Sequence, residues 1–182
     1  MWNLSNYFEL AYKALFLAPS FAANASPLIV KGFLKNRHPV DFGKNFTDGR
    51  RIFGENKSWE GVIAGVLVGT VVGIALVPLY GCTLVKLAVA GFVQGIGSMV
   101  GDLANSFLKR RLGIKPGEPL PFLDQTSFIV VSLMIVRLAG VDQLVGVGLG
   151  LVDMAIVIGI ALVLHPLTNY IAYLLKLKEV PY

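Results

Sequence analysis

The chain has 182 residues, of which 55% are hydrophobic, and its formal net charge is +5. Its apolar stretches reach about 20 residues, the length that spans a bilayer, and they are too long for strands or ordinary amphipathic helices. The composition therefore excludes a soluble globular protein and predicts an integral membrane protein with one domain, residues 1–182. Because the chain has one cysteine, Cys82, and two histidines, it excludes internal disulfides and a thiolate or histidine metal cage.

Five segments are predicted to cross the membrane as helices, so the expected fold class is all-α. Their approximate bounds are 7–25, 59–80, 87–107, 122–139 and 144–164. The first segment is the weakest, because Glu9, Lys13 and Pro19 interrupt it, although Glu9 and Lys13 are four residues apart and can neutralise each other. A cleaved signal peptide is the alternative for this segment. Such a peptide needs a basic start, and residues 1–7 contain no lysine or arginine.

Basic residues gather in two predicted loops, 26–58 and 108–121. Lysine and arginine accumulate on the cytoplasmic side of membrane proteins. We therefore expect the N-terminus outside, the C-terminus inside, and both long loops in the cytoplasm. This charge asymmetry can arise from topology and anionic lipid alone or from an anionic substrate, and a count of charges does not separate the two.

Glycine recurs in the second span at every fourth residue, at positions 61, 65, 69 and 73, which places all four on one helical face. Small residues on one face let another helix approach closely within lipid. Gly91 and Gly95 continue the pattern in the third span, so we expect spans two and three to pack together. Such packing would bring Lys57 toward Asp102 and links the first loop to the third span.

The third span also has one polar face, because its polar side chains recur at helical spacing. They are Ser98, Asp102, Asn105, Ser106 and Lys109. A carboxylate inside a spanning segment costs at least about 2.5–3.5 kcal/mol, so it usually faces a cavity and functions there. An aspartate solvated by headgroup water at the helix end is the alternative. Asp102 lies about two turns, roughly 10 Å, before Lys109, and therefore just below the basic end of the helix.

Asp124 begins the fourth span, across a short turn-rich loop from Asp102. Two aspartates that flank one loop can share a divalent cation, since Mg²⁺ prefers oxygen ligands and commonly takes one or two carboxylates together with phosphate and water. Lysines and arginines of both loops can hold phosphate oxygens, and Gly49, Gly54 and Gly117 allow close backbone approach. Together these features are typical of a site for a metal-bound nucleotide.

Two motifs frame this polar region. Ser106–Arg110 reads SFLKR and is followed by Lys115, and Asn56–Gly61 reads NKSWEG directly before the glycine-rich span. Both resemble the signature of the membrane CTP:phosphatidate cytidylyltransferases, and the resemblance covers roughly residues 44–127. Pro116 stands where the bacterial pattern has aspartate.

Two further departures lie in the second loop and after it. The glycine-rich turn of the bacterial pattern is reduced to Pro119–Pro121, and Gln125, not arginine, follows Asp124. With the short length and the five spans, these differences favour the archaeal branch of the family, which activates a diether lipid phosphate.

The resemblance implies Mg²⁺-dependent transfer of CMP from CTP to a lipid phosphate, which gives a CDP-lipid of the CDP-archaeol type and pyrophosphate. It implies an active site on the cytoplasmic side of the cell membrane, with Asp102 and Asp124 as metal ligands and Lys57 and Lys109 as further catalytic residues. CTP, a membrane lipid phosphate and the bilayer are the expected partners; no nucleic acid is expected, and a homodimer stays open. The nucleotide- and phosphate-binding residues that it implies are Asn45, Asp48, Gly49, Arg50, Arg51, Gly54, Asn56, Lys57, Ser58, Glu60, Asn105, Ser106, Lys109, Arg110 and Lys115.

The main alternative is a small transporter that uses Asp102 and Asp153 as ion sites. It explains acids in apolar segments but not two basic, glycine-bearing loops on one side. Asp153 is expected near the middle of the fifth span, in a structural or cavity-lining role, and His165 is expected at the membrane interface. A CDP-alcohol phosphotransferase is rejected, because the stretch that begins at Asp48 matches only the start of its motif.

Overall fold

The computed structural model describes residues 3–34, 36–176 and 180. This part of the chain contains eight helices and no strand, which confirms the predicted all-α class. The helices are α1 Leu4–Phe16, α2 Ala18–Phe33, α3 Trp59–Ala75, α4 Val77–Tyr80, α5 Leu84–Arg111, α6 Leu123–Ala139, α7 Val141–Leu144 and α8 Leu151–Leu174.

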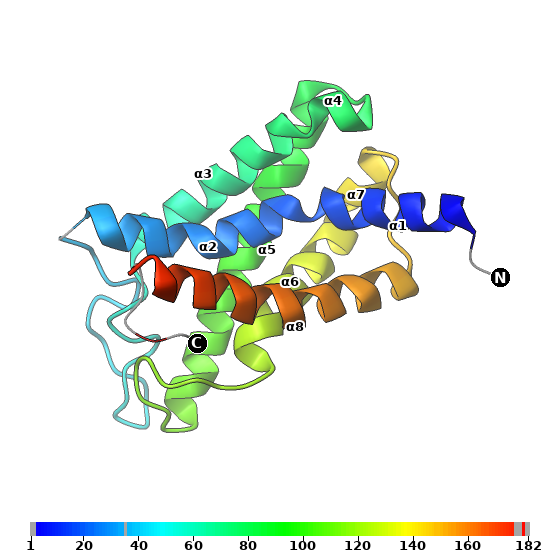
Figure 1. The fold of residues 1–182 in the computed structure, drawn as a ribbon. Helices are drawn as coiled ribbons and strands as arrows, with labels where there is room; N and C mark the ends of the chain where they lie inside the picture. Colours follow the sequence, from blue (N-terminus) through cyan, green and yellow to red (C-terminus); the bar gives the residue numbers. More distant parts are fainter. Residues whose placement is uncertain (1–2, 35, 177–179, 181–182) are drawn as a thin grey trace.

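Helix α5 is the centre of the bundle (Figure 1). It packs against α3 on one side and α6 on the other, and α2 contacts both α3 and α5. Helices α1 and α2 follow each other across the middle of the view, while α8 runs beside them and contacts α6 and α1. Residues 36–58, before α3, and the connection 112–122 lie together at the same end of the molecule, the lower left of the view.

Several helices begin or end at residues other than the bounds of the predicted spans, although the bounds at 59, 80 and 139 agree with the structure. The first predicted span, 7–25, falls on two helices, α1 and α2, which meet at Leu17 just before Pro19, and α2 continues to Phe33 within the predicted loop 26–58. The second span consists of α3 and a short α4 that contains Pro78. Proline lacks a backbone N–H and its ring collides with the preceding turn, so an α-helix breaks there.

The start of α8 corrects the expected position of Asp153. This helix begins at Leu151, not near residue 144, because Gly146 and Gly148 have φ angles of 77° and 57°, which interrupt a right-handed helix. Asp153 therefore lies in the first turn of α8 and not near its middle. It accepts a hydrogen bond from the backbone N–H of Gly150 at 2.8 Å.

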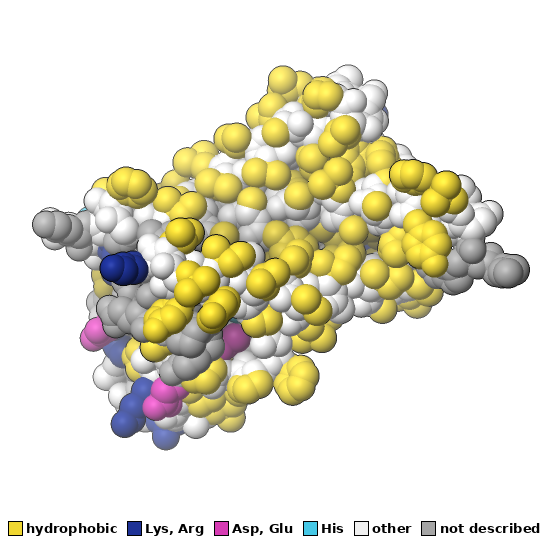
Figure 2. Space-filling view, viewed as in Figure 1, with side chains coloured by type: hydrophobic (Ala, Val, Ile, Leu, Met, Phe, Trp, Pro, Cys, Tyr) yellow, Lys and Arg dark blue, Asp and Glu magenta, His cyan; other side chains and the backbone are white. Residues whose placement is uncertain are grey.

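Two of the described helices, α5 and α8, are long and apolar enough to cross a bilayer, and α3 is apolar but shorter. Figure 2 shows hydrophobic side chains over most of the visible face, with charged side chains gathered at the end where the two long connections lie. An exposed apolar surface of this extent is typical of a protein that contacts a membrane.

The predicted packing of the glycine faces is confirmed. All four glycines of the α3 repeat are buried. A Cβ atom at Gly73 would lie 2.5 Å from the carbonyl oxygen of Leu87, and one at Gly91 would lie 2.4 Å from that of Gly69. The backbones of α3 and α5 are thus in direct contact, which only glycine permits. This contact places the residues just before α3 beside the polar end of α5.

A buried polar cluster joins α2, α5 and α6 at the break between α1 and α2. Gln94 donates to the carbonyl oxygen of Phe16 at 2.9 Å, and Ser98 donates to that of Ser20 at 3.0 Å. The Ser20 hydroxyl lies 2.7 Å from that of Ser132. Ser98 therefore faces α2, not the polar site where its spacing had placed it. Such bonds satisfy backbone groups that a helix break frees inside an apolar environment.

Candidate active site

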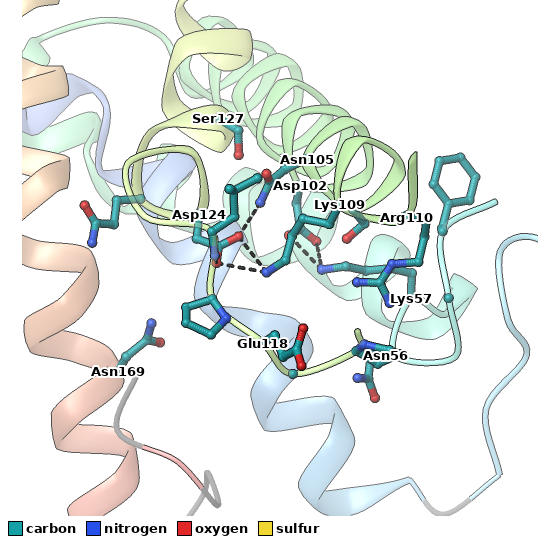
Figure 3. Close-up of a pocket in the computed structure, with 18 of the residues that line it drawn as sticks. Asn56, Lys57, Asp102, Asn105, Lys109, Arg110, Glu118, Asp124, Ser127 and Asn169 are labelled. Atoms are coloured by element: carbon teal, nitrogen blue, oxygen red, sulfur yellow. Dashed lines mark hydrogen bonds and ion pairs between the residues drawn. The ribbon is translucent and has the colours of Figure 1, made fainter. Parts of the chain in front are cut away.

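A polar pocket with a volume of about 390 Å³ lies at the end of the bundle where the two long connections meet (Figure 3). Its walls come from α2, the segment before α3, α5, the connection 112–122, the start of α6, and α8. The volume falls within the range of about 300–1,000 Å³ that is usual for small-molecule sites.

Lys57 and Asp102 form the first ion pair of the pocket. The Lys57 Nζ atom lies 2.7 Å and 2.6 Å from the two carboxylate oxygens of Asp102. Lys57 is held at this point because the next residue, Ser58, caps α3 by accepting the N–H of Gly61. Side chains 45 residues apart in the sequence thereby meet at the helix contact described above.

Lys109 and Asp124 form the second pair, with the Lys109 Nζ atom 3.0 Å and 2.9 Å from the carboxylate oxygens (Figure 3). Asn105 also donates to Asp124 at 2.6 Å, and so does the N–H of Leu120 at 2.7 Å. Asn105 and Lys109 are four residues apart on α5 and therefore reach the same partner. This ion pair holds the connection 112–122 against the polar end of α5.

The oxygen atoms of this pocket are of the chemical kind that Mg²⁺ takes as ligands together with phosphate. Asp102 and Asp124 both line the pocket, and the Oδ1 atom of Asn105 is buried without a hydrogen-bond partner. The described residues hold no group of three or more histidine, cysteine or acidic side chains placed for a metal. Two carboxylates with phosphate and water suit Mg²⁺, which usually keeps several waters and is seldom caged by protein alone.

Arg110 is a buried cation at the edge of the pocket. Its exposed fraction is 9%, and its Nε atom has no hydrogen-bond partner. Gly54, with φ at 101°, packs against the guanidinium: a Cβ atom there would lie 3.3 Å from Nη1. The Glu118 carboxylate interacts electrostatically with this guanidinium, but the buried Nε–H has no acceptor among the described residues. An unsatisfied buried donor is costly, so this position is suited to an anion that enters the pocket.

Asp41 organises the connection that carries Lys57. Its carboxylate is buried and accepts hydrogen bonds from the Arg51 guanidinium and from the backbone N–H groups of Gly43, Phe53 and Gly54. Burial alone raises the pKa of Asp41, but these hydrogen bonds outweigh burial and hold the pKa well below its usual range. Arg51 is thus tied to the loop, and sequence reasoning did not single out Asp41.

Arg111 fastens the same connection to the end of α5. It pairs with Asp48 at 2.9 Å and donates to the carbonyl oxygen of Arg51 at 2.6 Å. Its guanidinium also lies over the rings of Phe46 and Phe107, at 4.8 Å and 4.9 Å from their centroids.

The structure brings many of the predicted site residues into this pocket. Those that line it are Gly54, Asn56, Lys57, Asp102, Asn105, Ser106, Lys109, Arg110 and Asp124. Arg50, Arg51 and Lys115 line a neighbouring pocket instead, which Arg110 also borders.

The remaining predicted residues line neither pocket and have local contacts. Asn45 forms an isolated bridge with Arg51, and Asp48 pairs with Arg111. Gly49 follows Asp48 with φ at 76°. Ser58 caps α3, as described above, and Glu60 accepts hydrogen bonds from the backbone N–H and the ring of His38.

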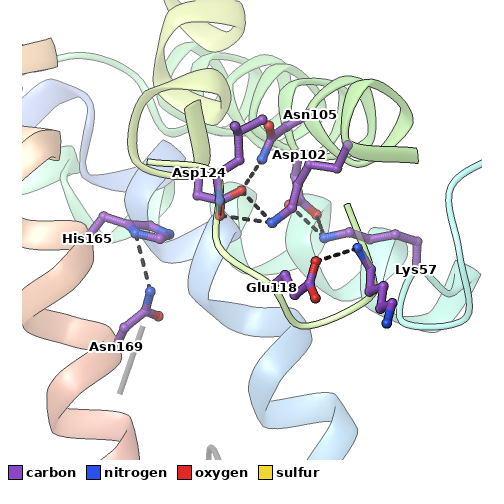
Figure 4. A network of polar contacts seen from close by, with 10 residues as sticks. Lys57, Asp102, Asn105, Glu118, Asp124, His165 and Asn169 are labelled. Atoms are coloured by element: carbon purple, nitrogen blue, oxygen red, sulfur yellow. Dashed lines mark hydrogen bonds and ion pairs between the residues drawn. The ribbon is translucent and has the colours of Figure 1, made fainter. Parts of the chain in front are cut away.

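Sequence reasoning missed several polar side chains of the pocket, among them Asn24, Glu118 and Asn169. His165 was expected at the interface, but it lines the pocket from α8, 3.3 Å from the Asn169 side chain (Figure 4). Two polar residues one turn apart in an apolar helix are a signal that could have found this pair.

The apolar helices, two of them long enough to cross a bilayer, and the pocket with its lysines and carboxylates define the class, an enzyme associated with a membrane. A solved structure described as an intramembrane enzyme for archaeal membrane lipids biosynthesis is similar to this chain, with a TM-score of 0.74 and 31% identity over 92% of this chain and 94% of that one.

Residues 7–182 match the model of the CarS-like, CDP-archaeol synthase family. The CDP-archaeol synthase of Methanopyrus kandleri is 42% identical over 97% of this chain and 95% of its own length. That of a Saccharolobus islandicus strain is 37% identical over 98% of this chain and 100% of its own. The chain therefore belongs to the CDP-archaeol synthase family of cytidylyltransferases that act on a lipid phosphate. This confirms the resemblance found in the sequence.

Proposed function

We propose that the chain catalyses Mg²⁺-dependent transfer of CMP from CTP to an archaeal diether glycerol-1-phosphate lipid, with release of pyrophosphate. The observation that carries the proposal is the pair of lysine–carboxylate contacts, Lys57 with Asp102 and Lys109 with Asp124, in one pocket at the end of apolar helices. Membership of the cytidylyltransferase family supports the reaction. The same family membership favours an enzyme over the transporter alternative.

The lysines and Arg110 bind phosphate oxygens in this proposal. Asp102 and Asp124 would hold the metal, which neutralises phosphate charge when it is bound. Each lysine that a carboxylate releases keeps its charge within the pocket and can contact a phosphate oxygen instead. The lysines thus orient CTP and the lipid phosphate toward each other.

The transfer itself needs no general base. An oxygen of the lipid phosphate attacks the α-phosphorus of CTP and forms a new P–O bond. The bond between the α-phosphorus and its bridging oxygen breaks, and its electrons leave with pyrophosphate. Because the nucleophile is already an anion, positioning and charge neutralisation supply most of the catalysis. A pocket of lysines, arginine and carboxylates suits this role.

We also propose a membrane topology with five crossings, formed by α1 with α2, α3 with α4, α5, α6 and α8. The N-terminus lies outside, the C-terminus and both long connections lie in the cytoplasm, and residues 1–182 form one domain. In this arrangement the pocket has a water side, made by the connections, and a membrane side, made by α2 and α8. A soluble nucleotide and a lipid-bound phosphate can then meet in it. No nucleic-acid partner is expected.

Incubation of the purified protein with labelled CTP and a panel of lipid phosphates tests the proposal. Diether glycerol-1-phosphate should be converted to a CDP-lipid, with an equal amount of pyrophosphate released from CTP, and this should be faster than with a diacyl phosphatidate. Excess chelator should stop the reaction, and added Mg²⁺ should restore it. A folded protein that forms no CDP-lipid from any member of the panel would refute the function, whereas full turnover with chelator present would refute only the metal requirement.

A further inference from the structure

A second pocket of about 360 Å³ lies beside the first, on the side of the two long connections. We call it the arginine pocket. Its charged side chains are four cations and one acid: Arg50, Arg51, Arg110, Lys115 and Glu55. The two pockets share Arg110, Glu55, Gly54 and Pro116, while the two lysine–carboxylate pairs line only the first. The arginine pocket is therefore joined to the first pocket at Arg110 and is separate from the proposed metal ligands.

The cations of the arginine pocket exceed the protein groups available to neutralise them. No described residue accepts a hydrogen bond from the buried Nε atom of Arg110. The Nη1 atom of Arg50 donates to the backbone oxygens of Arg110 and Arg111, at 3.2 Å and 2.8 Å, which fixes this guanidinium against the end of α5. Among the described residues Arg50 has no acidic partner, whereas Arg51 pairs with Asp41. Arg110 interacts electrostatically with Glu118, which lines only the first pocket. A fixed guanidinium such as that of Arg50, with no carboxylate of its own, suits an anion with several oxygens.

We propose that the arginine pocket binds free inorganic diphosphate and is the route by which this product reaches water, an inference that rests on the proposed function for the origin of the diphosphate. The residues that line it come from positions 50–55 and 110–116, outside the apolar stretches. The lipid product stays beside α2 and α8, whereas a soluble anion can leave across these connections. Glu55 lowers the net positive charge there and shortens the residence of the anion.

Titration calorimetry of the full-length protein with sodium diphosphate, without CTP and without Mg²⁺, tests this site. The expected result is binding that persists in Asp102→Asn, since that carboxylate does not line the arginine pocket. Ile114 lines only the arginine pocket and is half-buried, so a charge can be introduced beside the cations. Ile114→Asp should weaken diphosphate binding about tenfold through repulsion, while the matched neutral variant Ile114→Asn should bind like the wild type.

Two results would overturn the assignment. The first is diphosphate binding that requires both Mg²⁺ and Asp102 and is unaffected by Ile114→Asp. The anion would then occupy the first pocket. The second is no binding of diphosphate by folded protein that still binds CTP. Because the titration involves no turnover, failure of cytidylyl transfer does not affect its outcome. Normal transfer without metal-free diphosphate binding would reject the arginine pocket alone.

Discussion

The two ends of the helix bundle contain the same kinds of ion pair in different surroundings. At the pocket end, the Lys57–Asp102 and Lys109–Asp124 pairs line a cavity. The pairs at the opposite end tie helix ends together and line neither pocket.

At the opposite end, the carboxylate of each pair also accepts a backbone N–H. Lys13 bridges Glu9 and Asp153, and Asp153 also accepts the N–H of Gly150 at the start of α8. Arg137 pairs with the fully buried Asp142, which accepts the N–H of Leu149. The difference teaches that a carboxylate in an apolar segment becomes a candidate for chemistry when a cavity adjoins it, not through its position in the sequence alone.

The largest effect is expected for Asp102→Asn. This change keeps the shape of the side chain but removes the charge that would hold the metal, so kcat should fall roughly 10²–10³-fold. Asp153→Asn is the matched control at the opposite end, and its kcat should stay near wild type. Steady-state kinetics of both variants, with circular dichroism to confirm folding, measure the contrast. If both variants were folded and lost kcat to a similar extent, the proposed functional difference between the two ends would be refuted.

Lys57→Ala should have the next largest effect. The change removes a cation that is proposed to hold phosphate, so kcat/KM should fall by about 10–100-fold, the loss that accompanies a charged hydrogen bond of about 1.5–3 kcal/mol. Lys13→Ala at the opposite end is the matched control and should leave kcat/KM unchanged in the folded fraction. Kinetics with CTP and lipid phosphate varied separately will show which substrate Lys57 contacts, and unchanged constants for both would remove it from the site.

Asp142→Asn should lower the stability of the protein and leave its activity unchanged, the opposite of the two changes above. The change weakens a buried pair with Arg137 and should cost about 1–3 kcal/mol of stability, while kcat of the folded protein stays near wild type. Thermal unfolding in detergent, monitored beside activity at a temperature well below the transition, separates the two quantities. A selective loss of kcat without a lower Tm would show that the opposite end takes part in the reaction.

The smallest effect is expected from low pH, which should destabilise the connection that carries Lys57. The folded-state pKa of Asp41 lies below its ordinary value of about 3.9, so its carboxylate contributes stability above that value and loses the contribution as pH falls through the folded-state pKa. Hydrogen exchange should therefore show residues 41–54 losing protection below about pH 4 before α3 and α5 do. In Asp41→Asn this acid dependence should disappear, and an unchanged acid response in the variant would refute the assignment.

The sequence by itself determined the helical class, the polar end of α5 and the family. Those features are local, because the glycine repeat, the run from Asp102 to Lys109 and the SFLKR motif can be read at helical spacing without knowledge of any partner. The same periodicity correctly predicted that α3 and α5 are neighbours. It did not predict where helices break, which proline and left-handed glycine decide.

Only the tertiary structure decided which charges meet. Lys57 pairs with Asp102 because the glycine contact between α3 and α5 brings their ends together, and no local pattern specifies that pairing. His165 and Asn169 join the pocket because α8 packs against α6 and extends to the same end. Asp41 is an ordinary loop aspartate in the sequence, and only folding surrounds it with donors. Helical spacing fixes which side chains share one face, whereas the packing of distant helices fixes which faces enclose a site.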